Sequence, residues 1–215
     1  MKQSIRLMTL EDIPQAVEIE RAAFPLPWPA TNFKRELTSH TLTRYMVACA
    51  NRGNPANEAA TSSGEEPRRS RGLAASLPGL GRFLGGRDAS PAAGDFIVGF
   101  AGMWFMVDEA HLSNIAVRTA YRRRGVGESL LIAVIEQAVA ENARFVTLEV
   151  RASNIEATSL YRKYGFAEVG VRRGYYTDNG EDAILLTVDA IGSPAYQDFL
   201  SKLKQQHARR CGLDF

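Results

Sequence analysis

The chain has 215 residues, of which 45% are hydrophobic, so it is long enough to bury a full core within one domain. Its 26 basic and 24 acidic residues leave a net charge of +2, so no global field draws it to nucleic acid or to an anionic membrane, and any RNA contact must be local. The N-terminal stretch MKQSIRLMTLEDI lacks the apolar core of a signal peptide, and no apolar run is long enough to span a bilayer. We therefore expect a cytoplasmic protein.

The first elements in chain order are a strand over residues 4–8 and a helix that begins after Thr9 with acidic residues in its first turn. Three prolines between Pro25 and Pro29 end that helix, and a second helix is expected over residues 30–39. The proline-rich loop has two interpretations, a packed corner or a recognition loop. If it is a recognition loop, Phe24 and Trp28 form the wall of a substrate groove.

Strands are predicted over residues 44–50 and 96–106, and an unusual segment, residues 51–95, separates them. The segment is rich in Gly, Ala, Ser, Pro and Arg, a composition that buries too little apolar surface to offset chain entropy, so we expect mostly disorder. Its cluster of Arg68, Arg69 and Arg71 could dock on RNA. A tolerated surface insertion is the favoured interpretation, because long insertions in surface loops cost little free energy.

The stretch LSNIAVRTAYRRRGVG, residues 112–127, combines an apolar strand, a polar crossing and a glycine-bearing turn that opens a helix. Arg122, Gly125 and Gly127 form an R-x-x-G-x-G pattern, and apolar residues recur at helical spacing after it. At a helix N-terminus the first backbone N–H groups have no intrahelical partner, so they can bind phosphate. The pattern alone is also compatible with an ordinary turn before a surface helix, because short motifs recur by chance.

After this helix, residues 144–150 read as a buried strand that carries Glu149 near its end. Ser153 and Glu156 form a predicted capping box at the start of a helix that carries Tyr161 and is closed by Gly165. Strands over 166–171 and 183–188 follow as an antiparallel pair with a long connection, and a polar helix over 193–207 leads into a basic tail. This order predicts an α/β fold, one sheet with helices on both faces.

The order of strand, R-x-x-G-x-G turn, helix, strand ending in Glu149 and capped helix with Tyr161 resembles the GCN5-related N-acetyltransferase (GNAT) family. The pieces LSNIAV, YRRRGVG, LEVRASN, LYRKYGF and RRGYY are similar to those of its bacterial ribosomal-protein alanine N-acetyltransferases. The resemblance implies a GNAT fold, a mixed and mostly antiparallel central sheet, in a single domain over residues 1–215. The insertion at 51–95 and the polar helix and tail at 193–215 depart from the family pattern.

The resemblance also implies roles for two side chains. An N-terminal amine has a pKa near 8 and needs a base before it can attack a thioester. Glu149 would be that base, directly or through one water, since burial should raise its pKa; alternatively it only pairs with a neighbour such as Arg151. Tyr161 would be the acid that protonates the CoA thiolate, or it only packs the helix. His111 is interpreted as structural.

Acetyl-CoA is the implied co-substrate, and neither a metal nor Cys49 or Cys211 is required, because the amine attacks the thioester directly. Backbone groups of the strand would pair with the pantetheine arm, the turn would hold the pyrophosphate, and Asn154 would either bind the cofactor or serve only as a cap. The implied cofactor-binding residues are Ile115, Ala116, Val117, Arg122, Arg123, Arg124, Gly125, Val126, Gly127, Glu128 and Asn154. Which arginine contacts the 3′-phosphate stays open.

The implied function is acetylation of the N-terminal alanine of a ribosomal small-subunit protein, protein 18, by a monomer that needs no membrane and no direct contact with nucleic acid. The peptide groove would include Arg172, Arg173, Tyr175 and Tyr176; a solvated loop between strands is the less favoured interpretation of these residues. Two alternatives stay open. One is a GNAT enzyme for other protein N-termini or a small amine, and the other is a non-catalytic CoA-binding or ribosome-interacting module.

Overall fold

The computed structural model describes residues 3–27, 29–38, 42–50 and 95–212. The chain divides into a unit of residues 1–51 and 96–215 and a unit of residues 52–95, and only Asp95 of the second unit is described. The predicted disorder of 51–95 and the role of its arginines therefore lie outside the described residues. Within the described ranges, no helix is long and apolar enough to cross a bilayer.

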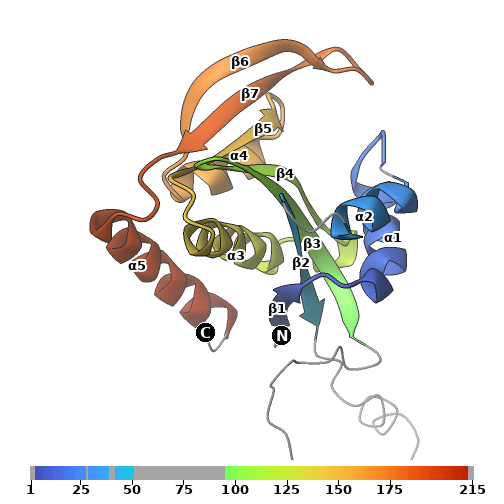
Figure 1. Cartoon of the computed structure of the whole chain (residues 1–215), viewed down its shortest axis with the longest axis horizontal. Helices are drawn as coiled ribbons and strands as arrows, with labels where there is room; N and C mark the ends of the chain where they lie inside the picture. The colour runs from blue at the N-terminus through green and yellow to red at the C-terminus, as the bar shows by residue number, and fades with distance from the viewer. Residues whose placement is uncertain (1–2, 28, 39–41, 51–94, 213–215) are drawn as a thin grey trace, which may run out of the picture. The chain divides into compact units, whose positions relative to one another are not determined.

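Seven strands form one mixed sheet in the order β1-β2-β3-β4-β5-β7-β6 (Figure 1). All neighbouring strands are antiparallel except β4 and β5, which are parallel. The mixed, mostly antiparallel sheet expected from the sequence is therefore confirmed. The strands are β1 (Gln3–Leu7), β2 (Thr43–Ala50), β3 (Phe96–Met106), β4 (Glu109–Val117), β5 (Phe145–Arg151), β6 (Ala167–Tyr176) and β7 (Glu181–Val188).

Helices cover both faces of the sheet, as Figure 1 shows. On one face α3 contacts β1 to β5 and has α5 beside it, while α1 and α2 contact β2 to β4 on the other face. The α-helices are α1 (Ile13–Ala23), α2 (Ala30–Thr38), α3 (Val126–Ala140), α4 (Ile155–Lys163) and α5 (Pro194–Cys211), with short 3₁₀ turns at Leu10–Asp12 and Thr119–Tyr121.

The alternation of side chains along β2 explains why this strand is buried on both faces. Met46 and Ala48 enter the core beneath α3, α4 and α5. Tyr45 and Val47 enter the second core, which α1 and α2 cover and where the ring of Phe33 packs 5.4 Å from that of Tyr45. Two apolar layers thus fix the central strands, and the site described below is built on β4 and β5 at the middle of the sheet.

Three predicted boundaries are wrong, each for a local physical reason. Asn154, rather than Ser153, caps α4, because its Oδ1 accepts a hydrogen bond from the backbone N–H of Ala157 at 3.1 Å while Ser153 N donates to Glu181. Residues 172–176 are not a loop, because β6 continues across a bulge and pairs with β7 up to Tyr176. The predicted basic tail from His207 is helical, because α5 ends only at Cys211, before Gly212 in a left-handed conformation.

Candidate functional site

The site lies where β4 and β5 separate. Their parallel ladder runs from the Glu109–Phe145 pair to the His111–Thr147 pair, and the described residues show no pairing between the two strands beyond it. The following residues of both strands line one cavity of about 830 Å³. They are Leu112, Ser113, Asn114 and Ile115 on β4 and Leu148, Glu149, Val150 and Arg151 on β5. The separation of these two central strands opens a groove. Beyond the ladder, the facing backbones of β4 and β5 border the groove and do not pair with each other.

Glu149 is one of four carboxylates of the described ranges that line this cavity, with Glu20, Glu36 and Asp178. Its side chain is only 6% exposed, with Oε2 3.1 Å from His111 Nε2 and Oε1 3.1 Å from an Arg172 guanidinium nitrogen. The hydrogen bond from His111 lowers the pKa of Glu149 and outweighs burial, which acts to raise it. Burial acts in the expected direction, but the expectation of a raised pKa is wrong, and Glu149 is ionised at neutral pH.

The partners of Glu149 also differ from those expected. Arg151, the neighbour proposed as its structural partner, instead contacts Asp178 at 2.7 Å and Glu181 at 3.2 Å. His111, interpreted from the sequence as structural, lines the cavity and packs its ring 4.9 Å from that of Trp104. The alternation of β4 was the available signal, since it places His111 and Ser113 on one side, but the register with β5 was not readable.

A buried phenol and a half-buried phenol, Tyr161 and Tyr176, face the same cavity. Tyr161, on α4, is enclosed by the core, and burial raises the pKa of its hydroxyl above the ordinary value. Burial likewise raises the pKa of Tyr176 to about 12, and the Arg151 guanidinium lies 3.9 Å from the centre of its ring. Both hydroxyls are protonated at neutral pH and can donate hydrogen bonds within the groove.

The R-x-x-G-x-G turn follows β4 after the 3₁₀ turn Thr119–Tyr121 and leads into α3. Gly125 is the N-cap with φ +84°, a conformation that favours glycine. The first helical bond is donated by Ser129 N to Gly125 O, so the N–H groups of residues 126–128 precede it. A Cβ at Gly127 would make only an ordinary contact with Val117 at 3.7 Å. The chain itself therefore does not need glycine there, and the space above the turn suits a bound anion.

The three arginines of the turn have different surroundings. Arg123 forms an ion pair with Glu156 at 2.6 Å, and both side chains are exposed. Arg122 Nε donates to the carbonyl oxygen of Val117, and the Arg124 guanidinium lies 5.4 Å from the ring centre of Tyr121. Among the described residues, Arg123 is the only one of the three with a carboxylate partner. Arg122 and Arg124 therefore keep their charge available to an anion at the turn.

The remaining predicted site residues fall into three groups. Phe24, Ile115, Asn154 and Tyr175 line the cavity together with Glu149, Tyr161 and Tyr176. Trp28 lies outside the described residues. Ala116 and Val117 do not line the cavity; Ala116 is buried in the core covered by α1 and α2, and Val117 packs against the core beneath α3.

Three charged side chains assigned to the site differ from expectation. Arg172 contacts Glu149 but is 54% exposed, whereas Arg173 is 85% exposed and binds Asp182, so the structure does not bring Arg173 into the groove. The Glu128 side chain is buried in a polar network with Lys163 and Tyr164, so only its backbone faces the turn. No group of three or more His, Cys, Asp or Glu that could hold a metal ion occurs in the described part of the chain.

Comparisons with known proteins match the chain to a family. The model of the acetyltransferase (GNAT) family matches residues 57–166. A Bacillus subtilis protein described as a candidate ribosomal protein bS18-alanine N-acetyltransferase is 30% identical over 187 residues, which cover 87% of this chain and 95% of that protein. The ribosomal protein bS18-alanine N-acetyltransferase of Escherichia coli is 44% identical over 91 residues, or 41% of this chain and 62% of that enzyme.

Solved structures extend the comparison to the fold. The crystal structure of the ribosomal-protein-S18-alanine N-acetyltransferase of Escherichia coli superposes with a TM-score of 0.62 at 27% identity, over 87% of this chain and 94% of that one. NAA60 of Arabidopsis thaliana, solved in complex with acetyl-CoA, has a TM-score of 0.62 at 16% identity over 87% and 99% of the two chains. The second likeness concerns the fold alone.

Proposed function

Because this chain belongs to the GNAT acetyltransferase family, we propose that it transfers the acetyl group of acetyl-CoA to the N-terminal alanine of the ribosomal small-subunit protein bS18. The observation that carries the proposal is the groove between β4 and β5, with Glu149 and Tyr161 facing it and an anion-binding turn at the end of β4. The acceptor is inferred from the names of the Bacillus subtilis and Escherichia coli relatives.

The residues of the turn fit the phosphates of CoA. Backbone N–H groups of Val126, Gly127 and Glu128 would bind the pyrophosphate at the positive end of α3, with added charge from Arg122 and Arg124. The backbone of β4 up to Val117 would pair with the pantetheine arm along the edge that β5 leaves. Asn154 uses Oδ1 to cap α4, which leaves its Nδ2 as the donor to the cofactor.

Glu149 receives the acceptor amine. The ionised carboxylate attracts the N-terminal ammonium and accepts a proton from it, while His111 holds the carboxylate in place. The amine nitrogen then forms a bond to the acetyl carbon and the carbon–sulfur bond breaks. The leaving thiolate takes the hydroxyl proton of Tyr161, the second proton of the nitrogen restores the Tyr161 hydroxyl, and Glu149 passes the first proton to solvent, so the step is balanced without an enzyme nucleophile.

The direct test is a thiol-release assay with acetyl-CoA and a synthetic peptide that begins Ala-Arg-Tyr, together with the same peptide acetylated at its N-terminus. We expect release with the free peptide alone. Glu149→Gln should lower kcat/KM on the order of a hundredfold or more without changing the Kd of CoA. The matched control is Glu168→Gln, which removes an exposed carboxylate that pairs with Arg162 outside the groove.

Two outcomes would contradict the proposal. If the wild-type protein binds CoA but releases no thiol with the peptide, the acceptor is wrong, and other protein N-termini or a small amine are tested next. If Glu149→Gln retains full activity, the amine loses its proton elsewhere and the role assigned to Glu149 is wrong.

A further inference from the structure

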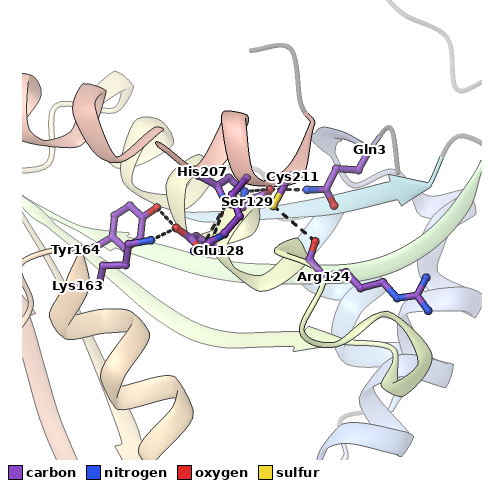
Figure 2. A network of polar contacts seen from close by, with 9 residues as sticks. Gln3, Arg124, Glu128, Ser129, Lys163, Tyr164, His207 and Cys211 are labelled. Atoms are coloured by element: carbon purple, nitrogen blue, oxygen red, sulfur yellow. Dashed lines mark hydrogen bonds and ion pairs between the residues drawn. The ribbon is translucent and has the colours of Figure 1, made fainter. Parts of the chain in front are cut away.

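The last two turns of α5 pack against the first turn of α3, which carries the anion-binding N–H groups. His207 of α5 is fully buried, and its Nε2 lies 2.7 Å from the hydroxyl oxygen of Ser129 (Figure 2). Its Nδ1 lies 3.4 Å from Glu128 Oε2. Both ring nitrogens of one buried imidazole therefore contact consecutive residues at the start of α3. This helix lies outside the part of the sequence that resembles the GNAT pattern closely.

The same end of α5 also touches the turn itself. Cys211 Sγ lies 3.9 Å from the carbonyl oxygen of Arg124, as the dashed line in Figure 2 marks. A Cβ added at Gly125 would lie 2.5 Å from that sulfur and 2.8 Å from Cε1 of His207. The N-cap of α3 is thus enclosed by two α5 side chains, and its backbone cannot move toward α5 without displacing them.

Glu128 links this contact to the rest of the molecule. Its carboxylate accepts hydrogen bonds from Lys163 Nζ at 2.5 Å and Tyr164 Oη at 2.7 Å, both from the end of α4, and from Arg210 of α5. Gln3 of β1 donates to the Ser129 hydroxyl at 2.6 Å. The first turn of α3 is therefore tied to β1, α4 and α5 through side chains alone, as Figure 2 shows.

The network also solves an electrostatic problem. A carboxylate in the first turn of α3 would repel a phosphate held at the N-terminus of the same helix if its charge were left unbalanced. Burial acts to raise the pKa of Glu128, but the hydrogen bonds from His207, Lys163 and Tyr164 outweigh it, so the pKa is lowered and the group stays ionised. The adjacent cations Lys163 and Arg210 compensate that charge.

We propose that His207 is a positioning residue for the acyl donor: it holds Ser129, Glu128 and Gly125 so that the N–H groups at the start of α3 stay aimed at the pyrophosphate. The proposal rests on the proposed function, because it takes the turn to be the CoA site. It assigns to α5 a role in donor affinity, with no contact to the reacting atoms and none to the peptide.

The test compares His207→Ala, His207→Gln and Lys204→Ala with the wild-type protein. Lys204 is the matched control, because it also joins α5 to α3, through Glu136, but away from the turn. We measure the Kd of CoA by calorimetry, and KM for acetyl-CoA, KM for the peptide and kcat by thiol release. His207→Ala should raise the Kd of CoA and KM for acetyl-CoA on the order of tenfold, the effect of loosening one charge-assisted contact.

The pattern across parameters separates positioning from folding. For His207→Ala we expect kcat and KM for the peptide to stay within about twofold of wild type, because a smaller folded fraction would lower apparent kcat instead. His207→Gln retains a group that reaches Ser129 and should restore part of the affinity, while Lys204→Ala should change neither constant. An unchanged Kd of CoA in folded His207→Ala, or a fall confined to kcat, would overturn the proposal.

Two further results are decisive. If His207→Ala does not fold, Ser129→Ala and His207→Gln are compared by the rise in Tm that saturating CoA produces, and a rise equal to that of wild type overturns the proposal. If the wild-type protein binds no CoA, the proposed function itself fails, and that result is recognised without any variant.

Discussion

At Glu149, burial and hydrogen bonding act on one carboxyl in opposite directions. Burial disfavours the charged form, whereas His111 and Arg172 stabilise it, and their combined effect holds the pKa below its ordinary range. The carboxylate is therefore ready to receive an ammonium group at neutral pH. If Glu149 is the base, as proposed, its lowered pKa makes it a weak one, so the geometry of its contact with the amine would have to contribute to the rate.

The first prediction concerns the pH dependence of His111→Ala. Without the imidazole, burial acts on Glu149 with less opposition, so its pKa rises. The acidic limb of kcat/KM, which reports protonation of this carboxylate, should move to higher pH. At pH 7 kcat/KM should fall by about tenfold, because the carboxylate loses its orienting contact. The measurement is the rate of thiol release between pH 4.5 and 8.

Glu109→Gln is the control for this prediction. It removes the carboxylate 3.7 Å from His111 Nδ1 but leaves the contact between His111 and Glu149 intact, so the acidic limb should stay in place. An acidic limb that is the same in His111→Ala and wild type would show that the imidazole does not govern the ionisation of Glu149.

Residue-scale detail also marks where sequence reasoning stops. Glu149 was identifiable because a carboxylate near the end of a buried strand is unusual, and a matching family pattern gave it a role. Its partner was not identifiable. His111 comes from another strand, and Arg172 from a stretch that reads as a loop, so both contacts depend on a register that single-strand patterns do not encode.

At the scale of elements, the turn before α3 separates three consecutive arginines by backbone conformation. Arg123 has φ +61°, in the left-handed region, and its side chain pairs with Glu156 of α4. Arg122 and Arg124 instead contact residues of the preceding segment, Val117 and Tyr121. Of these three consecutive arginines, one is therefore paired with a carboxylate, and the other two have contacts that leave their charge available to an anion.

The second prediction follows from that division. Arg122→Ala and Arg124→Ala should each raise KM for acetyl-CoA by about five- to tenfold, as expected for the loss of a charge-assisted contact to phosphate. Arg123→Ala should change KM by less than twofold, because an exposed ion pair contributes little and its charge is already matched by Glu156. Initial rates at several acetyl-CoA concentrations, in low and in moderate salt, provide the measurement.

Equal effects from all three substitutions would contradict this prediction. Such a result would mean that the turn acts through its total charge, and that the ion pair with Glu156 opens when the donor binds. A smaller effect in moderate salt for Arg122→Ala and Arg124→Ala, with none for Arg123→Ala, would support the assignment.

The elements that the sequence predicts well are those with a dense apolar signal. β3 and β5 are runs of largely buried residues, α3 has apolar residues at helical spacing, and the structure places all three close to where the sequence predicts them. β6 is mostly exposed on both faces, so its second half carries no apolar alternation and reads as a loop. It becomes a strand because β7 supplies backbone partners, a tertiary effect that local pattern does not contain.

At the scale of the molecule, the single sheet with helices on both faces was predictable, but the separation of β4 and β5 was not. The order of strands and helices along the chain indicates one α/β sheet. The point where β4 and β5 part depends on where the parallel ladder ends, three residue pairs after it begins. That ending creates the groove, so the feature on which the proposed function rests is one for which the sequence carries no local signal.

The final prediction concerns residues 51–95 as a whole. Ala50 and Phe96 are register partners at the end of the β2–β3 pair, so the two strands can be joined by a tight hairpin turn. Replacement of residues 51–95 by Asn-Gly should preserve kcat/KM for the peptide. It should raise the free energy of unfolding by about 2 kcal/mol, because a far shorter loop costs less entropy to close.

Urea unfolding and thiol release measure the two quantities, and a variant that carries a scrambled 51–95 sequence of the same length is the control. The scrambled variant keeps the loop-closure cost, so its stability and its kcat/KM should equal those of wild type. A fall in stability on replacement would mean that the segment makes contacts worth more than its closure entropy. A loss of kcat/KM in both variants, with stability kept, would instead mean that its particular residues serve the reaction, and the interpretation as a tolerated insertion would be wrong.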